Sequence, residues 1–154
     1  MRKILATAAT LGLASFGAIV PAANAQASTA CNNAYAAIPA GTFVAYSGAN
    51  CGATRLGSTT SWDSDWGNSS GPFQGRWQDT NNAESLVYKS SDARRVQLFN
   101  GTGDDWAGGH TCIRPDEYYM DTLEEQYFTS GVEVENEISS HRFIWSGCGA
   151  FLDS

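Results

Sequence analysis

A polar motif that occurs twice constrains the fold of this chain more than any other feature. The stretch NNAESL at residues 81–86 is followed, after roughly fifty residues, by ENEISS at residues 135–140. Two positions keep their residue type in this alignment: Asn82 with Asn136, and Ser85 with Ser139. Two such units fill the chain after its first 25 residues, whereas a propeller or a solenoid needs at least three. The repeat therefore predicts two similar units that interlock in one domain.

Short runs of alternating apolar and polar residues predict that each unit is made of strands. These runs end at turn signals such as Ser47-Gly48 and Asn100-Gly101. Helical periodicity is weak along the chain, apart from a turn around residues 121–126. The predicted strands are residues 42–46, 85–88, 95–99 and 142–145. Two units of about four short strands each predict an all-β sandwich of two interlocked Greek keys.

In both units a turn flanked by aromatic or similar residues precedes the polar motif. It reads YSGANCGA at residues 46–53 and FNGTGDDWAG at residues 99–108. Together with the polar motif, this turn resembles the Greek-key motif of the βγ-crystallins. Cys51 and Ala53 stand where the family usually has an aromatic residue and a glycine. The likeness covers residues 42–147.

The resemblance implies one βγ-crystallin-like domain at residues 26–154, with its Greek keys at about 42–90 and about 95–147. The glycine after the aromatic residue permits a positive φ, which folds the first hairpin back over the sheet. The hydroxyls of Ser85 and Ser139 are then expected to satisfy backbone groups of that hairpin. Both serines have a structural role on this interpretation.

Within this fold, the segment AGTFVAYSG at residues 40–48 looks like the start of the small bacterial peptidase (metalloproteinase) inhibitors of the crystallin type. Val44 stands where that family usually has a cysteine. The likeness implies a monomeric inhibitor whose partner is an extracellular peptidase. Such an inhibitor needs a rigid loop, so that binding orders little extra chain. We predict this loop at Cys112, Ile113, Arg114 and Pro115, with an internal strand as the alternative.

The amino terminus and the cysteines indicate secretion. Arg2 and Lys3 precede an apolar run at residues 4–20 and the small residues of Ala23–Ala25, which predicts a signal peptide at residues 1–25 rather than a retained membrane anchor. A secreted, extracellular chain is expected to pair its four cysteines. Of three pairings we favour Cys31–Cys51 and Cys112–Cys148, because each joins residues within one half of the domain.

Charge is unevenly distributed along the chain. Residues 26–103 contain five acidic and five basic residues, whereas residues 104–137 contain ten acidic residues and Arg114 as the one Lys or Arg. An acidic protein of this kind is not expected to bind nucleic acid or an anionic membrane. Cations or a basic partner protein fit better, and simple solubility is the alternative.

The resemblance also implies calcium sites built from the paired polar stretches. Calcium takes six to eight hard oxygen ligands and gains from anionic ones. The predicted ligands are Asn81, Asn82, Ser85, Glu135, Asn136, Glu137 and Ser139. The first copy offers neutral side chains alone, so a purely structural role for both stretches is the alternative. No cofactor is otherwise required.

Catalytic motifs are absent from the sequence, and we do not expect an enzyme. There is no G-x-S-x-G, no H-E-x-x-H and no glycine-rich phosphate loop. His110 and His141 are interpreted as surface residues in separate units. Trp62 and Trp66 either stack on a sugar or pack in the core. Two other classes therefore stand beside the inhibitor: a calcium-binding module with a protective or antimicrobial role, and a carbohydrate-binding surface protein.

Overall fold

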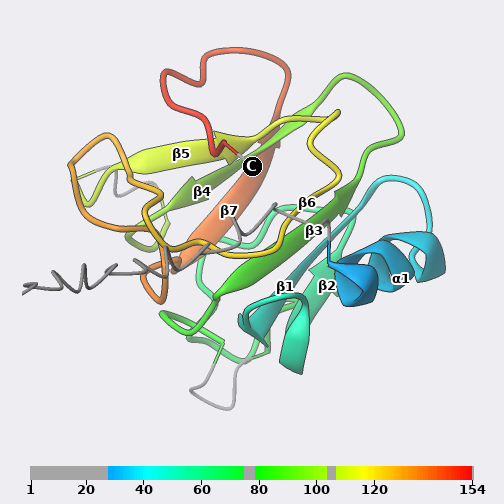
Figure 1. The fold of residues 1–154 in the computed structure, drawn as a ribbon. Coiled ribbons are helices and arrows are strands. Elements are labelled where there is room, and N and C mark those ends of the chain that lie inside the picture. Colours follow the sequence, from blue (N-terminus) through cyan, green and yellow to red (C-terminus); the bar gives the residue numbers. More distant parts are fainter. Residues whose placement is uncertain (1–27, 75–78, 104–106, 154) are drawn as a thin grey trace, which may run out of the picture.

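Two antiparallel sheets form most of the computed structural model, which describes residues 28–74, 79–103 and 107–153 (Figure 1). The first sheet has the order β2-β1-β3-β6, formed by Gly52–Thr59, Thr42–Gly48, Ser85–Lys89 and Tyr119–Met120. The second has the order β5-β4-β7, formed by His110–Ile113, Arg95–Phe99 and Ser140–Ile144. The prediction of an all-β fold is confirmed, and all four predicted strands are present. The predicted signal peptide lies outside the described residues.

A helix that the sequence pattern did not predict precedes the sheets. It is α1, Thr29–Ala37, and the side chain of Ser28 caps it by accepting a hydrogen bond from the amide of Cys31 over 3.4 Å. The apolar residues of α1 are mostly alanines, so its helical periodicity is too weak to detect. Cys31 is its one buried residue.

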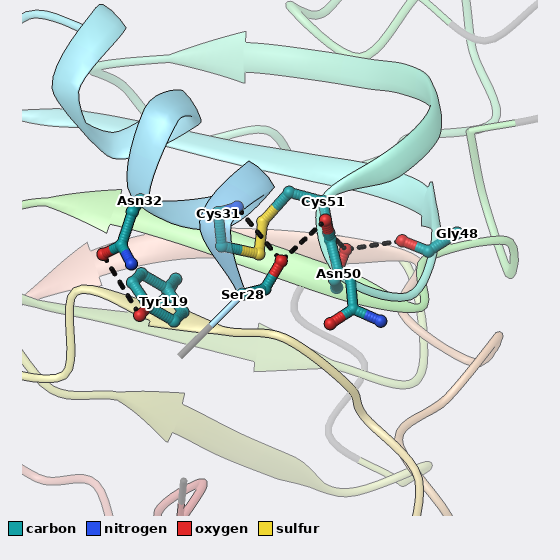
Figure 2. The surroundings of a disulfide bond; sticks show 8 residues. Ser28, Cys31, Asn32, Gly48, Asn50, Cys51 and Tyr119 are labelled. Carbon is teal, nitrogen blue, oxygen red and sulfur yellow. Dashed lines mark hydrogen bonds between the residues drawn. A yellow bond between two sulfur atoms is a disulfide. The ribbon is translucent and has the colours of Figure 1, made fainter. Parts of the chain in front are cut away.

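Tertiary contacts hold α1 against the outer face of the first sheet. Figure 2 shows the disulfide from Cys31 to Cys51, and the hydroxyl of Tyr119 donating to Oδ1 of Asn32 over 3.2 Å. The contact explains the burial pattern of β1, where Phe43 and Ala45 face the main core while Val44 faces the opposite way, into a small cluster that the helix covers. Alternation places successive side chains on opposite faces. Both faces of β1 are therefore buried.

Each half of the chain contributes a segment to the other half's sheet. The strand β6 lies in the second half but pairs with β3, where Leu86 faces Met120. In return, Asp63 of the first half forms an antiparallel bridge with His141 of β7, and their amides and carbonyls exchange hydrogen bonds of 3.0 and 2.8 Å. The two halves are therefore interlocked, as the repeat predicts.

The predicted left-handed residue is present in the first half, where Ala53 has φ of 53°. In the second half the predicted Gly108 does not have a positive φ, and the residue after it, Gly109, has φ of 87° instead. Gly108 is required for a different reason. A Cβ atom there would lie 1.7 Å from the carbonyl oxygen of Asn100, so no other residue fits without backbone movement.

Both predicted disulfides are confirmed. Cys31 pairs with Cys51, and Cys112 of β5 pairs with Cys148, which follows β7. Each bridge lies within one half, and together they fix α1 and the carboxyl-terminal segment to the sheets. Within the described ranges, no helix is long and apolar enough to cross a membrane.

Candidate functional site

The two polar stretches, residues 81–86 and 135–140, lie against each other and exchange backbone hydrogen bonds. The amide of Asn81 donates to the carbonyl oxygen of Ile138, and the amide of Asn136 donates to that of Ala83, both over 2.9 Å. Asn81 and Asn136 also share a left-handed backbone, with φ of 53° and 57°, which asparagine tolerates better than most residues. The exchange is reciprocal, as expected for two copies related by an approximate twofold axis.

This geometry corrects the alignment of the repeat by one residue. Asn81, not Asn82, is equivalent to Asn136. The hydroxyl of Ser85 donates to the carbonyl of Gly48 over 2.6 Å and accepts from the amide of Cys51 over 2.9 Å. In the second half Ser140, not Ser139, donates to the equivalent hairpin, at the carbonyl of Gly101 over 2.6 Å. The prediction that the hydroxyl of Ser85 satisfies backbone groups of the hairpin is confirmed. The prediction that Ser139 does the same in the second half is wrong, because Ser140 does so.

Ser139 instead joins the two stretches. Its hydroxyl donates to Oδ1 of Asn81 over 2.7 Å. The side-chain oxygen of Asn136 is buried and makes no hydrogen bond to any described residue. A buried acceptor without a donor costs about 1–3 kcal/mol, so this oxygen favours a hydrogen-bond donor or a cation at the contact between the two stretches.

Carboxylates gather beside this contact. Burial raises the pKa of Glu135, and the negative charges of Glu124, Glu84 and Glu133 raise it further, in that order. These four acids come from three segments of the chain, so the fold brings together charges that repel one another. Either a proton or a bound cation would relieve this repulsion.

The structure places the predicted calcium ligands in different surroundings. Glu135, Asn136 and Glu137 supply oxygens on one stretch, and Asn82 lies half-buried on the other. Ser85 is committed to the hairpin, and Ser139 and Asn81 bind each other. Within the described ranges, no three His, Cys, Asp or Glu side chains are placed to hold a metal ion by themselves. A cation here would depend on carbonyl and amide oxygens as well as on carboxylates.

The predicted inhibitory segment lies largely inside the fold. Cys112 and Ile113 are fully buried in β5, where they face Gln97 and Val96 of β4. Arg114 then turns toward the carboxyl terminus, where its guanidinium lies 4.2 Å from the ring centroid of Phe151. The side chains of this strand cannot enter a peptidase cleft, so the geometry favours the internal-strand alternative for its first two residues.

The loop that follows β5 is exposed and held at both ends. Tyr118 is 52% exposed and has φ of 63°. Its carbonyl accepts a hydrogen bond from the amide of Tyr88 over 2.8 Å, and its ring packs edge-on against Tyr35 with centroids 5.2 Å apart. At the start of the loop, the guanidinium of Arg114 lies 3.9 Å from the carboxylate of Glu117. We name residues 114–118 the β5–β6 loop.

His141 is buried, which overturns its interpretation as a surface residue. Its side chain is 1% exposed, and the indole N–H of Trp66 donates to its Nδ1 over 2.8 Å. An indole nitrogen can only donate, so Nδ1 accepts and the proton lies on Nε2, 3.0 Å from the carbonyl of Ser61. Burial lowers the pKa of His141 to about 3, although the bond to Ser61 opposes the shift. The ring is therefore neutral near pH 7.

The tryptophan pair divides between the two predicted roles. Trp66 is fully buried and stacks on Phe73 with ring centroids 4.0 Å apart, so it belongs to the core. Trp62 is 60% exposed. No sequence signal separates them, because the burial of Trp66 depends on His141, which is distant in the chain.

Comparison with known proteins gives no relative on which to build. No protein-family model, no curated protein and no solved structure matches the chain.

Proposed function

We propose that the protein is a secreted inhibitor of an extracellular peptidase, built on a βγ-crystallin-like pair of Greek keys. The segments that each half contributes to the other half's sheet support the Greek-key arrangement. In a Greek key the fourth strand returns beside the first, and β3 lies beside β1 as β7 lies beside β4. The third element of the first unit is the segment at Asp63, which pairs with β7 in the second sheet. The third element of the second unit is β6, which pairs with β3 in the first sheet.

The observation that carries the inhibitor proposal is the anchored, exposed β5–β6 loop. An inhibitor binds tightly when its contact loop is already ordered, because binding then immobilises little additional chain. Tyr118 offers a large side chain at this loop, and aromatic residues often dominate binding energy at interfaces. The disulfide at Cys112, two residues before Arg114, fixes the strand from which the loop leaves.

Titration against purified metallo- and serine peptidases tests this proposal. We expect stoichiometric inhibition of at least one peptidase by the mature protein. Tyr118→Ala should weaken inhibition by roughly tenfold or more, the size expected for losing an interface anchor. Tyr127→Ala is the matched control, because Tyr127 is similarly exposed at 55% but lies outside the loop. Absence of inhibition across the panel would contradict the proposal.

A second candidate, a calcium-binding module, is favoured by the unpaired oxygen of Asn136 beside the repelling carboxylates around Glu135. Calcium at a hundred times its Kd should stabilise the fold by about 2.7 kcal/mol. For a domain of this size, that raises the melting midpoint by several degrees.

The variant Glu135→Gln separates calcium binding from a structural role. It should abolish the calcium shift while leaving the metal-free midpoint unchanged or higher, because it removes repulsion from Glu124, Glu84 and Glu133. Asp116→Asn, at an exposed site in the β5–β6 loop, should keep the calcium shift. If millimolar calcium leaves the midpoint of the unmutated protein unmoved, the contact between the two stretches is structural alone.

A further inference from the structure

The exposed indole of Trp62 lines two depressions in the surface. The larger, of about 430 Å³, is lined by Thr60, Ser61, Trp62, Arg94, Arg142 and Phe143. The smaller, of about 200 Å³, is also lined by Trp62. A large apolar side chain that stays 60% exposed where it lines two depressions is in contact with water at a site able to accept a ligand.

The backbone on both sides of Trp62 is fixed by buried groups. The carbonyl of Ser61 lies 3.0 Å from Nε2 of His141, and Asp63 exchanges two backbone hydrogen bonds with the same residue. The buried carboxylate of Asp63 accepts from the amides of Asp65 and Phe73 over 3.0 and 3.1 Å. Trp62 is therefore presented on a rigid segment, and a ligand would not have to order it.

The larger depression is lined by two arginines on an otherwise acidic protein. The chain has 16 acidic and 9 basic residues, yet among the described residues that line this depression two are arginines and none is an acid. Arg94 is oriented by Asp92, 3.0 Å away, and Nε of Arg142 donates to Oε1 of Gln97 over 3.0 Å. Held guanidinium groups match the planar geometry of a carboxylate. An anionic ligand is therefore favoured in this depression.

The smaller depression supplies neutral polar groups. Its lining includes the hydroxyls of Ser64 and Ser70 and the amide of Asn68. Hydroxyls and amides both donate and accept hydrogen bonds, as the hydroxyls of a sugar require. Asp63 also lines this depression, but the residue is buried and its carboxylate accepts hydrogen bonds from backbone amides. A flat indole that lines both a depression with two arginines and a depression with hydroxyl groups fits a carbohydrate that carries carboxylates.

We propose that this surface binds an acidic polysaccharide. A sugar ring packs on the indole of Trp62, its carboxylate lies against Arg94 and Arg142, and hydroxyls of the neighbouring unit bond to the side chains of the smaller depression. This site is separate from the β5–β6 loop, so it does not depend on peptidase inhibition.

Affinity electrophoresis in native gels tests the proposal, with polygalacturonate as the acidic probe and its methyl-esterified form as the matched neutral probe. We expect polygalacturonate to retard the mature protein and the ester to have little effect. Trp62→Ala should weaken binding roughly tenfold or more, and Arg142→Gln should reduce the preference for the acidic form. Tyr118→Ala, an exposed aromatic in the β5–β6 loop, should bind as the unmutated protein does.

Three results would overturn it. The unmutated protein could migrate unretarded through polygalacturonate, or Trp62→Ala could be retarded equally. Equal retardation by the esterified form would show that the arginines do not select for charge. Because Trp62 is exposed, its alanine variant is expected to fold, and an unchanged near-ultraviolet circular dichroism spectrum apart from the lost indole verifies this.

Discussion

Acidification should destabilise the fold through His141, well before most carboxylates are protonated. The native ring is neutral because burial lowers its pKa from 6.5 to about 3. The unfolded chain binds a proton below about pH 6.5, so between these two pKa values the unfolded state binds more protons than the native state. The contribution of His141 to the free energy of unfolding is therefore constant above about pH 6.5, and it falls as the pH decreases from 6.5 toward 3.

The magnitude follows from linkage. Each pH unit well inside this window costs about 1.4 kcal/mol, so lowering the pH from 7 to 4.5 should remove roughly 2–3 kcal/mol. That is a large fraction of the 5–15 kcal/mol typical of a domain. The raised pKa of Glu135 acts in the opposite direction, because a native carboxyl that binds protons more readily gains stability in acid. A comparison between variants is needed to isolate the histidine.

Urea unfolding, followed by tryptophan fluorescence with the disulfides intact, provides that comparison. His141→Gln should be less stable than the unmutated protein at pH 7, because Trp66 loses its acceptor. It should also lack the part of the acid-induced loss of stability that comes from His141. The difference in stability between the two proteins should therefore shrink by roughly 2–3 kcal/mol at pH 4.5. His110→Gln, at a half-buried histidine, should keep most of the loss. Parallel pH profiles for the unmutated protein and His141→Gln would refute the reasoning.

Two further predictions concern the stability of the scaffold. Ser85→Ala and Ser140→Ala should each cost about 1–3 kcal/mol in urea unfolding, because each leaves a hairpin carbonyl without its donor, whereas Ser139→Ala should cost less; equal costs for all three would contradict the corrected alignment. Replacing both Cys112 and Cys148 by alanine should cost about 3–4 kcal/mol on the chain-entropy account, and an unchanged unfolding midpoint would show that the bridge contributes nothing.

The sequence predicted the elements that depend on local pattern. Period-two alternation located β1, β3, β4 and β7 within two residues at each end. The cysteines could be paired because the repeat divides the chain into halves, and each half contains two of them. The shortest strand, β6, has two residues and pairs with β3, so nothing local distinguishes it from a turn.

The alignment of the repeat could not be resolved to one residue from sequence. Ser139 and Ser140 are adjacent serines, so either can align with Ser85. Strand pairing decides between them: Tyr46 faces Ser85 across the first sheet, and Phe99 faces Ser140 across the second. A shift of one residue turns a strand's side chains to the opposite face, so only the tertiary register identifies which hydroxyl reaches the hairpin.

The corrected register also relates the fixed backbone around Trp62 to a difference between the two halves. In that register His141 is equivalent to Leu86, and both are buried: Leu86 faces Ala45, and His141 faces Leu98. A histidine in a position that suits leucine needs partners for two ring nitrogens, and Trp66 and the carbonyl of Ser61 supply them. Ser61 and Trp66 lie on either side of Trp62 in the sequence. The replacement of leucine by histidine in the second half therefore fixes the backbone around Trp62 in the first half. Function is expected where the two copies differ, because the shared features already suffice for the fold.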